Sequence, residues 1–312
     1  MVKMVTYDII IIGGGPAGLT AGIYASRALM KTALLEKIAP GGLVMTTEKV
    51  ENFPGFSEGV SGFELMGQME KQAIKFGLEI FSEEVIMINK EDNVFNIKTT
   101  TQNYKTLSII IATGTTYRKL GVEGESAFTS RGVSYCATCD GALFKNKEVI
   151  VVGGGDTALE ESLFLTRFVK KIYLVHRRDK LRAIGILQKR AIQNEKIEFV
   201  WNSAVSKIKG KSKIEGATIK NLVNNNERDI NIDGIFVFIG FEPNTGFLKD
   251  FVKLDENGYV IADVEMKASR DGVFTAGDVR RGALRQIITA CGDGALAAVS
   301  AQHFVEQLKY KT

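Results

Sequence analysis

The chain has 312 residues, of which 45% are hydrophobic and 24% are charged, a composition typical of a soluble globular protein with room for two domains. Its formal charge of +4 is spread along the sequence, so we expect no nucleic-acid partner. No stretch approaches the roughly 18 apolar residues of a membrane span, so no membrane partner is expected either. The apolar run Ile9 to Ile12 leads straight into glycines rather than into a cleavage site, which favours a cytoplasmic protein without a signal peptide.

The first predicted unit is a strand, a helix and a second strand. The apolar run Tyr7 to Ile12 precedes Gly13-Gly14-Gly15-Pro16-Ala17-Gly18, and a helix of small residues is predicted from Leu19 to Ala28. Glycines at these positions permit a tight turn, close approach to a pyrophosphate and close packing of the helix, whose N-terminus faces the anion. The next predicted strand, Lys31 to Leu35, ends at Glu36, whose carboxylate can accept hydrogen bonds from a ribose diol. The pattern predicts a site for a dinucleotide with a free 2′-hydroxyl.

A further apolar strand is predicted from Ile109 to Ile111, and it runs into the turn Ala112-Thr113-Gly114. A buried strand that stops at a glycine would explain this segment equally well. Its assignment to the first nucleotide site therefore depends on a similar segment near the other end of the chain.

The strongest chemical signal is Cys136-Ala137-Thr138-Cys139, followed directly by Asp140. A CxxC pair can close a small disulfide that accepts two electrons, and a neighbouring carboxylic acid can handle the proton that thiol chemistry moves. We interpret the pair as redox-active and the chain as an electron-transfer enzyme.

Two structural interpretations of the pair are less favoured. A closed zinc site needs four Cys or His ligands, but the remaining candidates, Cys291, His176 and His303, are scattered, so no metal is expected. A structural disulfide is disfavoured because a CxxC loop is short and strained, and because nothing suggests export. Cys291 lies in a run of small residues and is expected to be a buried small hydrophobe.

A second glycine fingerprint, Gly153-Gly154-Gly155-Asp156-Thr157-Ala158, lies between a predicted strand at 148–152 and a predicted helix at 157–168. The strand-loop-helix context is the same as in the first unit. The sequence therefore predicts a second dinucleotide site.

The two sites differ in the residues that follow their second strand. Glu36 lies 23 residues after Gly13, and the same step from Gly153 leads to His176-Arg177-Arg178, at the end of the predicted strand 171–175. Arg182 follows shortly afterwards. Guanidinium groups suit a 2′-phosphate, which a carboxylate would repel, so we expect the second site to bind NADPH.

The pattern of an apolar strand and a glycine turn returns at Gly272 to Asp278. This segment and the one at 109–114 flank the second fingerprint, which predicts that the chain begins one domain, inserts another and returns to finish the first. We expect Cys291-Gly292-Asp293-Gly294 to open a last helix from Ala295 to Gln307, with its positive end toward the first cofactor.

Together these motifs resemble those of the low-molecular-weight, bacterial-type thioredoxin reductases, class II members of the pyridine nucleotide-disulfide oxidoreductases. The similarity extends over essentially the whole chain, and its most specific segments are CATCDG at 136–141 and HRRDKLRA at 176–183. The other matching segments are GGGPAG at 13–18, ENFPG at 51–55, ATG at 112–114, GGGDTALEE at 153–161, GFEPNT at 240–245, FTAGDV at 274–279 and RQIITACGDGA at 285–295.

The resemblance implies an α/β fold with two Rossmann-like three-layer domains, the second inserted in the first. The FAD-binding domain would comprise residues 1–117 and 247–312, and the NADPH-binding domain, which carries the CATC disulfide, residues 118–246. NADPH would reduce FAD, FAD would reduce the disulfide, and the freed thiol would reduce oxidised thioredoxin. A homodimer is also implied.

Individual roles follow from the same resemblance. Cys139 resembles the flavin-facing sulfur, Cys136 the interchange thiol and Asp140 the acid that protonates the leaving thiolate. Leu43 stands where the family usually has Gln, so it is not counted as a ligand. The implied contacts of the first cofactor are Gly13, Gly15, Pro16, Ala17, Gly18, Glu36, Gly42, Asn52, Ala112, Thr113, Gly114, Gly277, Asp278, Arg285, Gln286 and Ile287. Those of the second are Gly153, Gly155, Asp156, Thr157, His176, Arg177, Arg178 and Arg182.

Other functions stay open at this point. The chain could reduce a different dithiol partner, or it could be a redox-sensing flavoprotein without catalytic turnover. A ferredoxin-type NADP reductase of the same fold is disfavoured because those relatives lack CxxC. Hydroperoxide-reductase relatives carry an extra N-terminal dithiol domain, for which the residues before Tyr7 leave no room.

Overall fold

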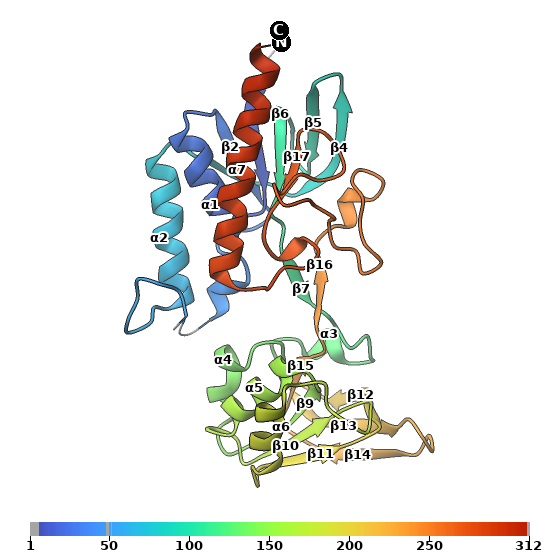
Figure 1. Ribbon diagram of the computed structural model, residues 1–312. Helices are drawn as coiled ribbons and strands as arrows, with labels where there is room; N and C mark the ends of the chain where they lie inside the picture. Colours follow the sequence, from blue (N-terminus) through green and yellow to red (C-terminus); the bar gives the residue numbers. More distant parts are fainter. Residues whose placement is uncertain (1–5, 48–49, 51, 311–312) are drawn as a thin grey trace. The chain divides into compact units, whose positions relative to one another are not determined.

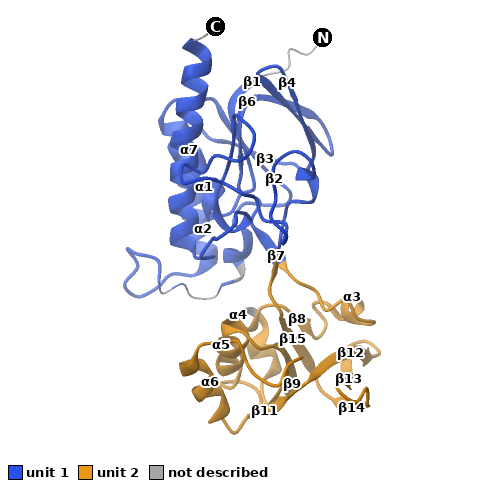
Figure 2. Cartoon of the chain, turned by 45° about the vertical axis from the view of Figure 1, so that its right-hand side comes forward, with its two compact units in different colours: residues 1–116, 242–312 blue, residues 117–241 orange. Residues whose placement is uncertain are grey.

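A computed structural model describes residues 6–47, 50 and 52–310, except for the side chains of Thr46 and Cys139. The chain forms two compact units, residues 1–116 with 242–312 (unit 1) and residues 117–241 (unit 2) (Figure 2). It crosses between them at 116–117 and at 241–242, where the sequence predicted 117–118 and 246–247. The crossing segments are the short strands β7 (Thr115–Tyr117) and β16 (Phe241–Pro243), which pair with each other.

Unit 1 contains a seven-stranded sheet of order β3-β2-β1-β6-β5-β4, in which β17 also pairs with β6 (Figure 1). Strands β3, β2, β1, β6 and β17 pair in parallel, and β4 and β5 continue the sheet antiparallel. The strands are β1 (Thr6–Ile12), β2 (Thr32–Glu36), β3 (Glu79–Ser82), β4 (Val85–Glu91), β5 (Val94–Thr99), β6 (Asn103–Ile111) and β17 (Val273–Thr275). The helices are α1 (Pro16–Arg27), α2 (Gly62–Lys75) and α7 (Ile287–Tyr310), with short 3-10 turns η1 (Gly42–Thr46), η3 (Gly246–Leu248) and η4 (Gly277–Val279).

The central strand β1 is buried on both faces. Ile9 and Ile11 point into the core formed with α1, α2 and α7, whereas Ile10 and Ile12 pack on the opposite side with residues of β4, β5 and the segment 248–279. Neither Ile9 nor Ile11 exposes any surface. A parallel strand that is covered on both faces is apolar at its buried positions, which is why β1 ends in the apolar run Ile9–Ile12.

Unit 2 repeats this plan on a five-stranded, all-parallel sheet of order β11-β10-β9-β15-β8. A separate antiparallel sheet has the order β12-β13-β14. The strands are β8 (Val133–Ser134), β9 (Glu148–Gly153), β10 (Lys171–Val175), β11 (Ile197–Val200), β12 (Ser203–Gly210), β13 (Ile214–Asn221), β14 (Glu227–Asn231) and β15 (Gly234–Phe238). The helices are α3 (Glu125–Phe128), α4 (Ala137–Asp140), α5 (Asp156–Leu165) and α6 (Gly185–Ile192), with the 3-10 turn η2 (Gly141–Phe144).

The residues of β9 alternate in the same way as those of β1. Val149 and Val151 lie in the core with α5 and α6, and Ile150 and Val152 lie in the core with the antiparallel sheet. Each unit is therefore a three-layer arrangement, with helices on one face of its parallel strands and β structure on the other (Figure 1). In unit 1 the covering β structure is the antiparallel part of the sheet, β4 and β5, and in unit 2 it is the separate sheet β12-β13-β14. The predicted fold class is confirmed: the chain is α/β, with two Rossmann-like units, the second inserted in the first. In the described part of the chain, no helix combines the length and apolarity that a membrane crossing requires.

One predicted element is wrong. The last helix does not open at Cys291–Gly294, because α7 already begins at Ile287 and runs to Tyr310. Gly294 lies within this helix because α1 comes very close: a Cβ atom at Gly294 would overlap the carbonyl oxygen of Ala17. Close helix packing, rather than a helix end, explains this glycine.

We expect Gly294→Ala to lower the melting temperature, because the added methyl group must push α7 away from α1 at an overpacking cost of about 1–3 kcal/mol. Gly292→Ala is the matched control, since a Cβ there meets nothing within 4 Å. It should leave stability unchanged or raise it by up to about 1 kcal/mol through helix propensity. Thermal unfolding followed by circular dichroism measures both, and equal melting temperatures would contradict this explanation of Gly294.

Candidate active site

In unit 1, the register of the parallel strands brings distant segments to one edge of the sheet. Ile12 at the end of β1 pairs with Leu35 of β2 and with Ile111 of β6, and Ile111 pairs with Thr275 of β17. Gly13, Ala112 and Ala276 directly follow β1, β6 and β17, and Glu36 is the last residue of β2. The first predicted cofactor site is thus assembled from residues 12–36, 111–114 and 275–278, which lie far apart in the sequence.

The first glycine loop has both a packed side and an open side. Gly13 has a φ of +107°, and a Cβ atom there would overlap the carbonyl oxygen of Ala112. A Cβ at Gly15, by contrast, meets nothing within 4 Å. Gly15 is the N-cap of α1, and Pro16 is its first residue. No side chain caps the first turn of α1, and an uncapped helix start beside the open space at Gly15 suits an anion.

The remaining predicted residues of this loop have packing roles or border the opening. A Cβ at Gly18 would overlap the carbonyl oxygen of Gly13, so helix and loop pack closely. Ala17 is buried beneath Gly277, where an added Cβ atom would come within 2.9 Å of the Ala17 methyl group. Gly42 approaches Gly15 so closely that a Cβ atom at Gly42 would lie 3.3 Å from the Gly15 Cα.

Polar contacts hold the rim of this site. Oε2 of Glu36 accepts a hydrogen bond from the amide of Gly14 at 2.6 Å, which places the predicted ribose ligand against the glycine loop. The side-chain nitrogen Nδ2 of Asn52 donates a hydrogen bond to Gln286 Oε1 at 3.0 Å, which joins two predicted ligands that are 234 residues apart. The next residue, Ile287, is the first of α7.

Asp278 lies in the 3-10 turn η4, and burial raises the pKa of its carboxyl group, with the nearby cation of Arg285 opposing this shift. Its turn is held by Asp293 and Arg280, neither of which the sequence marks as a partner of this turn. Asp293 accepts hydrogen bonds from the Gly277 amide at 3.1 Å and from Arg280 at 2.6 and 2.9 Å. The GDG pattern around Asp293 was visible, but its pairing with Arg280 depends on the contact between α7 and η4.

Asn244 is another supporting residue that the sequence did not reveal. Its side-chain amide donates to the carbonyl oxygen of Thr113 at 2.8 Å, and its backbone carbonyl accepts from the Thr113 hydroxyl at 2.9 Å. Its backbone amide also donates to the carbonyl of Gly114. Three hydrogen bonds therefore fix the turn after β6.

The second glycine loop, in unit 2, follows the same plan. A Cβ at Gly153 would lie 2.5 Å from both Ala158 and the Phe238 carbonyl oxygen, whereas one at Gly155 meets nothing within 4 Å. Gly155 is the N-cap of α5, and Asp156 and Thr157 are its first two residues. Here too, no side chain caps the helix start, and the open space at Gly155 suits an anion.

His176 supports this loop from beneath. Its ring is 5% exposed and lies against Gly154, where any Cβ atom would overlap the imidazole. Nε2 lies 3.1 Å from the carbonyl oxygen of Lys180. Burial lowers the pKa of His176, which favours the neutral form of its ring.

Three arginines follow His176 in the sequence: Arg177, Arg178 and Arg182, which are all exposed. Two hydrogen bonds fasten their segment to the glycine loop: the Arg182 amide donates to the Gly154 carbonyl at 2.7 Å, and the Ile184 amide donates to Asp156 Oδ1 at 2.7 Å. The fold therefore places guanidinium groups beside the second loop, as the spacing predicted. Whether they bind a cofactor stays a prediction.

The CxxC segment lies between β8 and α5 in unit 2. Cys136 is disulfide-bonded. The Ser134 hydroxyl accepts a hydrogen bond from the Cys136 backbone amide and donates one to the Cys136 carbonyl oxygen, both at 3.1 Å. Asp140 is half-buried, and its amide bonds back to the Cys136 carbonyl at 3.3 Å. The side chain of Cys139 lies outside the described residues, so its pairing with Cys136 and its role toward a flavin stay predictions. Cys291 is a free, partly buried thiol packed against the helical core of unit 1.

A buried carboxylate holds the chain just before this disulfide. Glu125 is 2% exposed, and its two oxygens accept from the amides of Leu120 and Gly121, both at 2.7 Å, and from the Tyr135 hydroxyl at 2.7 Å. Nothing in the local sequence marks Glu125, because its partners become neighbours only in the folded unit.

A protein-family model described as "Pyridine nucleotide-disulphide oxidoreductase" matches residues 7–294. The chain belongs to this family. Thioredoxin reductase from Treponema pallidum (strain Nichols) is 46% identical over 303 residues, covering 97% of this chain and 98% of that relative. Thioredoxin reductase from Bacillus subtilis (strain 168) is 47% identical over 306 residues, covering 97% and 96%.

Solved structures agree with the sequence relatives. Lactococcus lactis thioredoxin reductase has a TM-score of 0.87 at 45% identity, covering 96% of this chain and 99% of that one. The thioredoxin reductase of T. acidophilum has a TM-score of 0.83 at 36% identity, covering 97% and 99%. The resemblance to bacterial-type thioredoxin reductases is therefore confirmed.

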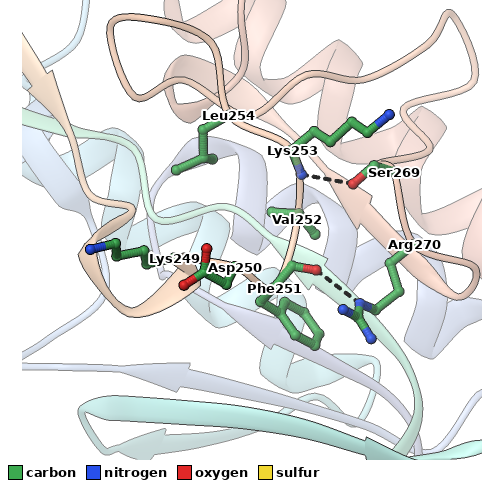
Figure 3. A pocket seen from close by; sticks show the side chains of 8 residues that line it. All are labelled: Lys249, Asp250, Phe251, Val252, Lys253, Leu254, Ser269 and Arg270. Carbon is green, nitrogen blue, oxygen red and sulfur yellow. Dashed lines mark hydrogen bonds between the residues drawn. The ribbon is translucent and has the colours of Figure 1, made fainter.

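A surface pocket of this oxidoreductase lies apart from the predicted ligands. It is lined by residues 249–254 of unit 1 together with Ser269 and Arg270, none of which the sequence assigned to a site (Figure 3). Its contacts are internal: Arg270 donates to the Phe251 carbonyl at 2.8 Å, and the Lys253 amide donates to Ser269 at 2.7 Å. These bonds stabilise the loop and do not define a ligand.

We expect Glu125→Ala to destabilise the oxidoreductase by about 3 kcal/mol or more, because it leaves two amides and a hydroxyl without their acceptor. Tyr135→Phe removes just one of these bonds and should cost about 1 kcal/mol. Denaturant unfolding of both variants measures the difference. A smaller effect for Glu125→Ala than for Tyr135→Phe would contradict the bracing role.

Proposed function

We propose that this oxidoreductase is an NADPH-dependent thioredoxin-disulfide reductase that contains FAD and acts through Cys136, Cys139 and Asp140. The observation that carries the proposal is the disulfide at Cys136 in the same compact unit as a glycine loop flanked by three arginines. The relatives named thioredoxin reductase support the choice of protein substrate. We extend the proposal to a cytoplasmic homodimer on the family resemblance.

The residues of unit 1 fit FAD. The open side of Gly15 and the amides of α1 suit a pyrophosphate, and Glu36, which bonds the glycine loop, would accept hydrogen bonds from a ribose diol. Asn52, Asp278, Arg285 and Gln286 would complete this set, with Pro16, Ala17, Gly18, Gly42, Ala112, Thr113, Gly114, Gly277 and Ile287 around them.

The residues of unit 2 fit NADPH in the same way. Gly153 and Gly155 with Asp156 and Thr157 would surround the pyrophosphate, and Arg177, Arg178 and Arg182 would bind the 2′-phosphate. His176 would act by supporting the loop. When bound, the flavin and the nicotinamide supply a two-electron route to the disulfide.

The protein's own residues then perform thiol-disulfide exchange. The Cys136 thiolate attacks a sulfur of oxidised thioredoxin, which forms a mixed disulfide and releases one thioredoxin thiolate. Cys139 attacks Cys136 in that mixed disulfide, which restores the disulfide of the enzyme and releases reduced thioredoxin. Asp140 supplies the proton for a leaving thiolate, as its half-buried position beside the pair allows.

The decisive test is NADPH-dependent reduction of oxidised thioredoxin by the FAD-loaded enzyme. Cys136→Ser should abolish thioredoxin turnover while flavin reduction by NADPH persists, because it removes the attacking sulfur. Cys291→Ser, which alters the free thiol of α7, should retain turnover. Flavin reduction without turnover on thioredoxin in the unmodified protein would reject this substrate, and turnover on a different dithiol protein would assign that partner instead.

We also expect a strong preference for NADPH over NADH. Hydrogen bonds to charged groups contribute about 1.5–3 kcal/mol each, so two arginines on the 2′-phosphate correspond to a preference on the order of a hundredfold or more. Replacing both Arg177 and Arg178 by Ala should remove most of it, as measured by the ratio of kcat/KM for the two cofactors. Arg228→Ala in β14 is the charge-matched control. Comparable kcat/KM values in the unmodified enzyme would defeat the assignment.

A further inference from the structure

Helix α5, which starts at the second glycine loop, also carries a carboxylate that contacts the disulfide segment. Glu161 accepts a hydrogen bond from the backbone amide of Ala137, the residue directly after Cys136. Its other oxygen, Oε2, is buried and has no hydrogen-bond partner among the described residues. Burying a carboxylate oxygen without a partner is costly, so this arrangement calls for an explanation beyond packing.

The surroundings of Glu161 disfavour its charge. Burial raises the pKa of Glu161, the neighbouring charge of Glu160 raises it further, and the hydrogen bond from Ala137 opposes both. Elements packed against α5 are α4, α6, β9 and β15. Their titratable groups with described side chains are Asp140, Glu148, Lys189 and Arg190, and none of these contributes to the shift. No cation in the described structure therefore neutralises the carboxylate.

We propose that Glu161 is a positioning residue that controls the protonation of the reduced Cys136–Cys139 pair. The inference rests on the proposed function and deepens it. Reduction of the disulfide takes up two electrons and two protons and yields two thiols. At a pH where Glu161 is ionised, a thiol of the pair that loses its proton places a second negative charge near the Glu161 carboxylate, across the contact between α4 and α5.

The direction of the effect follows from electrostatics. A like charge in a poorly solvated place raises the pKa of a thiol, because it destabilises the thiolate. At a pH where the reduced pair is partly ionised, a less stable thiolate makes the reduced form less stable. The negative charge of Glu161 therefore makes the pair a stronger reductant. Glu161 would thus keep the thiols of the reduced pair protonated to a higher pH. Once a thiol of the pair ionises and attacks a partner disulfide, the pair would be more strongly reducing.

Three variants separate charge from structure. Glu161→Gln removes the charge but keeps a side-chain oxygen that can accept from the Ala137 amide. Glu160→Gln makes the same chemical change one residue away, on an exposed side chain. Glu161→Asp keeps the charge and tests whether the carboxylate itself is responsible.

The experiment uses the full-length, FAD-loaded protein, reduced with dithiothreitol. The alkylation rate of Cys136 by iodoacetamide, read by mass spectrometry across a pH series, gives the apparent thiol pKa. Equilibration with dithiothreitol mixtures, at a pH above that pKa, gives the reduced fraction. We expect Glu161→Gln to lower the thiol pKa by a unit or more and to favour the reduced pair about tenfold, which is about 30 mV for this two-electron couple. Glu160→Gln and Glu161→Asp should stay within about twofold of the unmodified protein.

Two results would overturn the inference. One is an unchanged thiol pKa in Glu161→Gln, including the case in which its melting temperature alone falls, because the role would then be structural. Another is an equal shift in Glu160→Gln. Because dithiothreitol performs the reduction, the thiol readout does not need NADPH or thioredoxin turnover. A protein that fails to turn over thioredoxin but shows the predicted shift would refute the proposed function and leave the role of Glu161 intact.

Discussion

The parallel pairing of β1 with β2 and β6 is the constraint on which the first site depends. It aligns Ile12 with Leu35 and Ile111, so that a glycine loop, an acidic residue and a second turn emerge at the same edge. The turn after β6 comes so close that Gly13 has no room for a side chain beside the Ala112 carbonyl. On the other side of the loop, a Cβ atom at Gly15 would meet no atom within 4 Å, and this open space makes the loop a candidate for binding an anion.

The two units share this architecture and differ in how the second strand ends. In unit 1 the carboxylate of Glu36 bonds the glycine loop directly. In unit 2 the corresponding position holds the buried His176, and the segment after it is fastened through the Arg182 amide and Asp156. One fold therefore presents a negative charge at one loop and guanidinium groups at the other, and this difference in charge favours different nucleotides.

The disulfide segment has little structure of its own and is held from outside. Ser134 brackets Cys136 from the end of β8, while the buried carboxylate of Glu125 fixes Tyr135. Glu125 has three donors for its two oxygens, whereas Glu161 has a single donor and a buried free oxygen. A fully paired carboxylate stabilises a loop, whereas burying a carboxylate oxygen without a partner costs free energy, and this difference is why we propose a redox-linked role for Glu161 and not for Glu125.

The sequence alone was enough to predict the strands that lead into the glycine loops and turns, both glycine loops, the inserted order of the units and the family, because these depend on local patterns. Apolar runs within the strands, Ile9–Ile12 and Val149–Val152, identified β1 and β9. Glycine spacing identified the loops, and CATCDG with HRRDKLRA identified the relatives. Tertiary structure decided what local patterns do not encode. The close approach of α1 explains Gly294 within α7, and the folded units supply the partners of Asp293, Asn244, Glu125 and Glu161. Each of these contacts joins residues from different elements or loops, and a side chain's burial and hydrogen-bond partners are set only when the elements pack.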